Sequence, residues 1–229
     1  MSNSVECISD QVDDIKTAVI KAIQEVAEQF CRSPGDFAYE ADVRSVLYAE
    51  VRKTLDHEKF RVKFSVNEPQ KCDQVFLSER NGINPVKAEY PNPPGGLGGR
   101  FDLAILSRLS LSDQRRAMHQ PFIAAIETKL WQDDKATGNQ SRSDGVRADC
   151  KKLALAIAQM RTPERHSFGL ALVFVHPGGD AEREFKRFRA ELKERPLRNL
   201  QEILEGPVSL VAVVPAEKEA KLMALNCPS

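Results

Sequence analysis

Two short segments, RFDLAIL at residues 100–106 and FIAAIETKLW at residues 122–131, decide how this chain folds. Each segment has the length and apolar character of a buried strand, yet each carries charged residues inside it. Burying a polar group without a partner costs about 2–7 kcal/mol, and burying a charge costs more. Asp102, Glu127 and Lys129 therefore need a reason to lie there, and a bound divalent cation would provide one.

The composition limits the class of protein. The chain has 229 residues, of which 41% are hydrophobic, so it can bury one sizeable core without a second domain. Its 33 basic residues balance 33 acidic ones, so we expect only weak DNA binding by this chain alone. The five cysteines include no C-x-x-C pair, which disfavours a disulfide framework or a zinc site.

The pattern of residues near the N-terminus favours a cytoplasmic protein. Residues 1–14 are polar and acidic, unlike a secretory signal, and no apolar run is long enough to span a bilayer. Apolar residues then recur every three or four positions between residues 8 and 30, which predicts an amphipathic helix. We expect residues 1–35 to form this N-terminal helix outside the main core, packed on that core or in a dimer contact.

The main core is expected at residues 36–215. A second helix should span residues 39–55, and the alternating residues 60–66 predict a strand, followed by an irregular stretch through Gly99. After the two charged strands we expect a helix from about residue 146, a strand at 169–175 and a helix capped by Asp180. A short helix at 197–204 and a strand at 208–214 should follow, and the tail, residues 216–229, is expected to be a frayed helix. This order predicts an α/β sandwich around a central mixed sheet flanked by helices.

The charged residues of the two strands predict a metal site. Because side chains alternate along a strand, Glu127 and Lys129 project from one face, about 7 Å apart. If the strands pair, the carboxylate of Asp102 converges on Glu127. Magnesium usually takes one or two carboxylates together with water and substrate phosphate, and the backbone carbonyl of Thr128 offers a further oxygen. Lys129 would then lie beside the attacking water.

This arrangement resembles the PD-(D/E)xK nuclease superfamily, which has the restriction-endonuclease-like fold. Its members carry an aspartate on one strand and E-x-K on the next within an αβββαβ core, and here Asp102 and Glu127-Thr128-Lys129 match. The resemblance covers residues 39–175. Many members also place a glutamate on the preceding helix, where Glu40 is the best match. Phe101 stands where the family name has proline, the least constant part of the pattern.

The resemblance implies a Mg²⁺-dependent or Mn²⁺-dependent endonuclease that hydrolyses phosphodiester bonds in DNA and leaves a 5′-phosphate and a 3′-hydroxyl. Asp102, Glu127 and Thr128 would ligate the metal, Lys129 would position the attacking water, and Glu40 would assist. Since the net charge is zero, a protein partner or a second subunit is expected to help hold the DNA.

Other interpretations of the same residues stay open. The chain is either an active nuclease or an inactive nuclease-like module that binds nucleic acid or a protein partner. Alternatively, the charged strands form structural ion pairs in an unrelated α/β fold. Glu40 either serves the site or favours the dipole of its helix. Asp149 either lies near the site or pairs with Lys152 three residues later.

Three further features are expected to be structural. Trp131 is predicted to pack in the core or at a sheet edge rather than to stack on a base. The glycine-rich segment at residues 94–99 lacks a following G-K-[ST] and precedes a strand, so it predicts a hairpin loop rather than a phosphate-binding loop. Residues 183–198 are rich in basic residues but also hold three glutamates, with a fourth at Glu182, which is typical of a solvated amphipathic helix.

Overall fold

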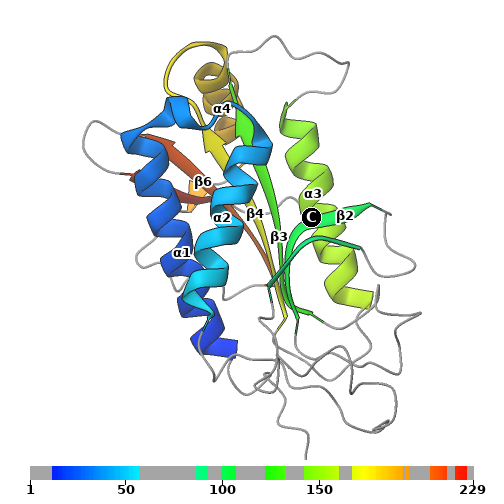
Figure 1. Ribbon diagram of the computed structural model, residues 1–229. Coiled ribbons are helices and arrows are strands. Elements are labelled where there is room, and N and C mark those ends of the chain that lie inside the picture. The colour runs from blue at the N-terminus through cyan, green and yellow to red at the C-terminus, as the bar shows by residue number, and fades with distance from the viewer. Residues whose placement is uncertain are drawn as a thin grey trace, which may run out of the picture.

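The computed structural model describes residues 12–56, 86–91, 99–106, 122–132, 142–159, 167–192, 194–195, 207–215 and 220–225. They form an α/β structure in which a mixed sheet carries helices on both faces (Figure 1). The helices are α1 (Val12–Arg32), the 3₁₀ turn η2 (Pro34–Asp36), α2 (Glu40–Thr54), α3 (Arg142–Gln159) and α4 (Gly179–Glu191). The strands are β1 (Val86–Pro91), β2 (Arg100–Leu106), β3 (Phe122–Trp131), β4 (Phe168–Val175), β5 (Glu194–Arg195), β6 (Val208–Pro215) and β7 (Ala220–Leu225).

The sheet has seven strands in the order β1-β2-β3-β4-β6-β7-β5. Its centre is parallel, with β4 paired to β3 on one side and to β6 on the other. All eight residues of β4 are buried, as expected for a parallel strand covered on both faces. The outer pairs β1/β2, β2/β3, β6/β7 and β5/β7 are antiparallel.

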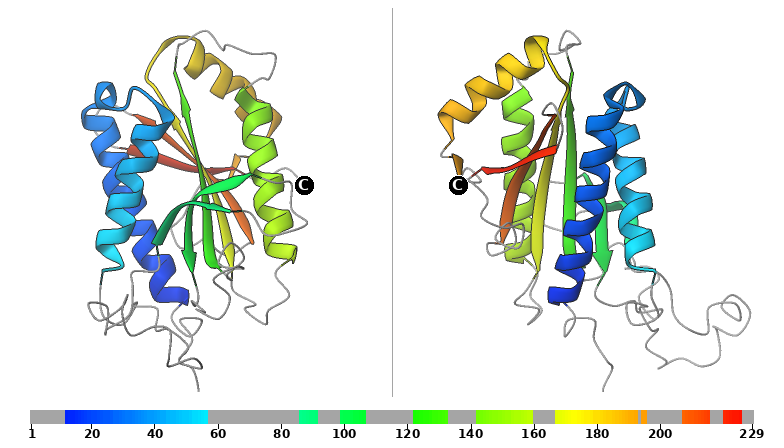
Figure 2. Two further views of the ribbon diagram at one scale, coloured as in Figure 1. Left: turned by 45° about the vertical axis from the view of Figure 1, so that its right-hand side comes forward. Right: turned by 90° about the vertical axis from the view of Figure 1, so that its left-hand side faces the viewer.

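Two helical layers cover the sheet. Helices α1 and α2 lie together on one face, and α3 and α4 lie on the other (Figure 2). Strand β3 serves both layers because its side chains alternate: Ile126 packs toward α1 and α2, whereas Ala125 packs toward α3 and α4. Helix α1, expected outside the main core, packs on the sheet beside α2 and buries one whole face in the same core.

The order of helix, three strands, helix and strand is present, but its first strand is not the expected one. Strand β1 lies at Val86–Pro91, within the stretch expected to be irregular, so that expectation was wrong. Its sequence VKAEYP gives little strand signal, because only Val86 and Tyr90 are buried and the strand forms the sheet edge beside β2. The strand expected at residues 60–66 lies outside the described residues.

Two expectations for the C-terminal half were also wrong. Residues 220–225 form strand β7 instead of a frayed helix, because pairing with β6 along its whole length outweighs the helix-favouring residues of AKLMAL. Helix α4 begins at Gly179 with Gly178 as N-cap at φ +89°, a conformation that favours glycine, so Asp180 lies in the first turn and contacts Arg183. The short helix expected at 197–204 lies outside the described residues.

The strands expected at 169–175 and 208–214 correspond to β4 and β6, and the helix expected from residue 146 corresponds to α3. Within the described residues, no helix is both long and apolar enough to cross a membrane.

Candidate active site

The site lies where β2 and β3 separate. Their pairing runs from Leu106 opposite Phe122 to Leu103 opposite Ile126. The next residue on each strand is a carboxylate, Asp102 on β2 and Glu127 on β3. One position further along β3, the Thr128 backbone N–H donates to the Asp102 carboxylate at 2.7 Å. A side chain thus takes the place of a backbone partner in the ladder, which keeps Asp102 beside β3 as the strands diverge.

Asp102 is held on both of its oxygens. Oδ2 accepts hydrogen bonds from the Thr128 N–H and from the Thr128 hydroxyl, each at 2.7 Å. Oδ1 lies 3.3 Å from a guanidinium nitrogen of Arg44 on α2. These three contacts orient the carboxylate, which is only 9% exposed as a residue. Asp102 is therefore a rigid anion shared between β2, β3 and α2.

A strained residue on β1 lies opposite Asp102. Glu89 has φ +51°, in the left-handed region that a residue with a Cβ rarely adopts. The register places Glu89 across from Asp102, between the pairs Ala88–Leu103 and Tyr90–Phe101. Phe101 packs in the layer of α3 and α4, whereas Leu103, two residues on, packs in the layer of α1 and α2.

This irregularity has a consequence for charge. The Glu89 carboxylate contacts Arg44, the same guanidinium that faces Asp102, and also lies 3.9 Å from Arg100. Arg44 is thus shared by two carboxylates from neighbouring strands. Backbone strain of this kind costs about 1–3 kcal/mol and persists where surrounding contacts hold it in place. The Arg44 contacts are such a constraint.

Glu127 is the most deeply buried charged residue of the site, at 4% exposed. The ammonium of Lys152 on α3 lies against its Oε1 in an ion pair, although that oxygen accepts no well-directed hydrogen bond from the described residues. Lys152 is fixed in turn by donating to the Arg100 carbonyl at 2.9 Å and by lying over the Phe101 ring. Burial raises the pKa of Glu127 from 4.5 to about 8, and Lys152 only partly opposes this.

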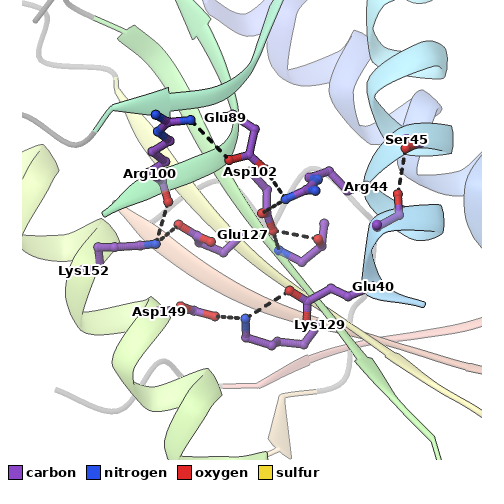
Figure 3. A network of polar contacts seen from close by, with 12 residues as sticks. Glu40, Arg44, Ser45, Glu89, Arg100, Asp102, Glu127, Lys129, Asp149 and Lys152 are labelled. Atoms are coloured by element: carbon purple, nitrogen blue, oxygen red, sulfur yellow. Dashed lines mark hydrogen bonds and ion pairs between the residues drawn. The ribbon is translucent and has the colours of Figure 1, made fainter. Parts of the chain in front are cut away.

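Lys129 lies between two carboxylates from different helices (Figure 3). Its ammonium is 3.4 Å from Glu40 on α2 and 3.1 Å from Asp149 on α3. Burial by itself lowers the pKa of Lys129, but Asp149 and Glu40 outweigh burial and raise it from 10.5 to about 12. Lys129 is therefore a fixed cation near neutral pH and is not available as a proton acceptor.

The two helices that reach Lys129 are placed by contacts near the end of β3. The Gln132 side-chain amide donates to the carbonyls of Phe37 at 3.2 Å and Ala38 at 2.5 Å, which fixes the segment before α2. Glu40 follows directly, in the first turn of α2, so it both favours the helix dipole and contacts Lys129. Burial raises the pKa of Glu40.

The structure brings together all four residues expected to be catalytic, Asp102, Glu127, Lys129 and Glu40 (Figure 3). Thr128 contributes its N–H and hydroxyl to Asp102; because the N–H and C=O of a strand residue point to the same edge, its carbonyl also faces β2. Trp131 is 1% exposed and packs edge-on against Phe185 and Phe188, which confirms that it is a core residue.

Sequence reasoning missed two members of the cluster. Arg44 was not assigned to the site, and Glu89 lay in a stretch expected to be irregular. Lys152 was expected near the site as a possible phosphate contact, and its ion pair with Glu127 was not foreseen. The alternative that Asp149 pairs with Lys152 is wrong, because Asp149 contacts Lys129 and Lys152 contacts Glu127. The sequence signal that Asp149 and Lys152 lie together at the site was their spacing on α3, because residues three apart share one face of a helix.

The donors of the site suit a hard divalent cation, with one restriction. No group of three or more His, Cys, Asp or Glu is arranged to hold a metal ion within the described residues. Magnesium, however, commonly uses only one or two protein carboxylates. Asp102 and Glu127 provide two, and the buried Glu127 Oε1 lacks a directed hydrogen bond. The residues therefore fit a two-carboxylate site, in which Arg44 and Lys152 already contact the ligand oxygens.

In comparisons with known proteins, no family model, no curated protein and no solved structure matches this chain.

Proposed function

We propose that this protein is a divalent-metal-dependent nuclease of the restriction-endonuclease-like fold, acting on phosphodiester bonds in DNA. The observation that carries the proposal is the convergence of Asp102, Glu127 and Lys129 at the point where β2 and β3 separate (Figure 3). Burying charge is costly, and a cluster of buried titratable groups with shifted pKa values marks a candidate functional site. The mixed sheet and the order of helices and strands are compatible with the αβββαβ core of that fold.

Each residue has a chemical role in the proposal. Asp102 and Glu127, with the Thr128 carbonyl, would hold Mg²⁺ or Mn²⁺. When bound, such an ion polarises a phosphoryl oxygen and makes nearby water acidic enough to attack near neutral pH. Lys129, held as a cation by Glu40 and Asp149, orients the attacking water and stabilises the negative charge that develops on the phosphoryl group.

One observation favours a second candidate function, an inactive nuclease-like module that binds nucleic acid or a protein partner. Arg44 contacts Asp102 and Lys152 contacts Glu127, so both carboxylates already have internal counter-ions. In a binding module these two ion pairs would only stabilise the folded structure. The two functions differ in one measurable respect, because only the nuclease requires a metal ion at these carboxylates.

Calorimetric titration of Mn²⁺ tests the proposal. Wild type and Asp102→Ala/Glu127→Ala are titrated with and without a short DNA duplex, and cleavage of the duplex is followed in parallel. The control is Asp180→Ala/Glu182→Ala, which removes two carboxylates from the exposed side of α4. We expect binding and cleavage in wild type and in the control, and neither in the site variant. Equal Mn²⁺ binding by all three proteins, or none by any, would refute the nuclease and favour the binding module.

A further inference from the structure

We propose that Lys152 is a built-in competitor of the metal ion: its ammonium neutralises Glu127 in the free protein and leaves that carboxylate when a divalent cation binds. The released ammonium then contacts a substrate phosphate. This inference rests on the proposed nuclease function, and it assigns to α3 a residue that lies outside the Asp102 and E-x-K motif.

The geometry of Lys152 carries the first step. Its ammonium lies against Glu127 Oε1, the oxygen of the most buried carboxylate in the site. If Glu127 ligates a metal ion, that ion and the Lys152 ammonium are therefore two cations on the same carboxylate. Two cations on one buried anion repel strongly because little water screens them. Metal binding and the Glu127–Lys152 ion pair are thus competing states of one side chain.

The charges on α3 are the reverse of those on β3 (Figure 3). Strand β3 presents Glu127 and then Lys129, while α3 presents Asp149 and then Lys152, and the two sets pair crosswise. This arrangement neutralises the site without a bound ion. A cation at Glu127 leaves Lys152 without its partner, so the site then has a spare positive charge.

A substrate phosphate is the natural new partner for that charge. Lys152 retains two further contacts, with the Arg100 carbonyl and the Phe101 ring, neither of which is an anion. Its side chain is 15% exposed, so the ammonium reaches solvent with a small movement. A lysine acts on phosphate as a mobile point charge. Metal and DNA should therefore strengthen each other's binding through Lys152.

The test measures Mn²⁺ affinity by electron paramagnetic resonance in wild type and Lys152→Gln, with and without a non-cleaved phosphorothioate duplex. Lys151→Gln is the matched control, because Lys151 is the exposed neighbour on the same helix. Removing the competing charge should tighten Mn²⁺ binding in the absence of DNA by about tenfold or more, a change of about 1.4 kcal/mol. It should also shrink the increase in affinity that DNA causes. Lys151→Gln should behave as wild type.

A second readout does not depend on cleavage. In EDTA, Lys152→Gln should lower the melting temperature, and saturating Mn²⁺ should restore it, because the ion replaces the lost counter-charge. If Lys152→Gln is too unstable to titrate, Lys152→Arg, which keeps the charge, should fold and bind Mn²⁺ as wild type does; tighter binding by Lys152→Arg would count against the inference.

The two proposals fail in different ways. Mn²⁺ binding that requires Glu127 but is equally tight in wild type and Lys152→Gln would overturn the competition and leave the nuclease intact. Absence of Mn²⁺ binding in both proteins, with or without DNA, would overturn the nuclease itself and the competition with it. Weaker binding in Lys152→Gln would also overturn the competition, since the lysine would then support the metal site.

Discussion

The cluster at β3 and the outer side of α4 contain the same kinds of charged residue, but the cluster is buried whereas the outer side of α4 is exposed to solvent. Both interleave acidic and basic side chains at close range. In the cluster, Glu127 and Lys152 are 4% and 15% exposed, whereas on α4 the Lys186 side chain that lies 2.7 Å from Glu182 is 68% exposed. Ion pairs on a wet surface contribute little, while a buried charge depends on its partner. Charged residues therefore indicate a functional site only when the fold removes them from water.

The largest expected effect comes from breaking the buried pair. Lys152→Ala should destabilise the protein by up to about 3–5 kcal/mol at pH 8, because the buried Glu127 carboxyl loses its counter-ion and must either bind a proton or carry an unpaired charge. Lys186→Ala, the corresponding change on α4, should leave stability unchanged within error. Urea unfolding without metal at pH 8 measures both. Equal losses in the two variants would remove the distinction between the cluster and the helix surface.

The pH dependence of stability sharpens the comparison. The pKa of Glu127 rises from 4.5 to about 8 on folding. The contribution of Glu127 to the free energy of unfolding is therefore fully present below pH 4.5 and is lost as the pH rises to about 8. At about 1.36 kcal/mol per pKa unit, the loss amounts to roughly a few kcal/mol. Glu127→Gln should remove this dependence. The pKa of Glu182 is lowered by its hydrogen bond to Lys186, so Glu182→Gln should not change the pH dependence above pH 4.5.

Asp149 tests whether helix α3 holds Lys129 in place. Asp149→Asn removes the strongest interaction that raises the pKa of Lys129, so this pKa should fall below about 12. Cleavage should fall on the order of 10-fold to 100-fold, as is usual when the partner of a site residue is lost. A pH–rate profile and the NMR titration of the lysine ammonium measure the two effects. Asp144→Asn, an exposed carboxylate on the same helix, should change neither.

The smallest expected effect concerns a pair of intermediate exposure. Arg147 on α3 and Glu191 on α4 lie 2.5 Å apart, with side chains 36% and 45% exposed. Glu191→Gln should lower stability by about 0.2–1 kcal/mol at low ionic strength. High salt should abolish this difference, because exposed charges are screened within a Debye length. The effect of Lys152→Ala should survive the same salt, and thermal unfolding at two salt concentrations compares them.

Local sequence patterns predicted the four central strands β2, β3, β4 and β6 and the charged residues that β2 and β3 carry. The apolar runs of β2, β3, β4 and β6 are buried on both faces, so composition alone marks them. For the same reason Asp102, Glu127 and Lys129 stood out as exceptions within apolar segments. Strands β1 and β7 gave no such signal, since each lies toward a sheet edge and forms because a neighbouring strand offers hydrogen bonds.

The partners of the charged residues could not be predicted from the chain. Alternation along a strand and spacing along a helix operate over a few residues, so they identify Glu127, Lys129, Asp149 and Lys152 as two local pairs. The packing of α3 against β3 decides that these pairs exchange partners, and the packing of α2 decides that Arg44 reaches Asp102. Local periodicity specifies which side chains share a face, whereas electrostatic pairing depends on distances that exist only after distant segments have packed together.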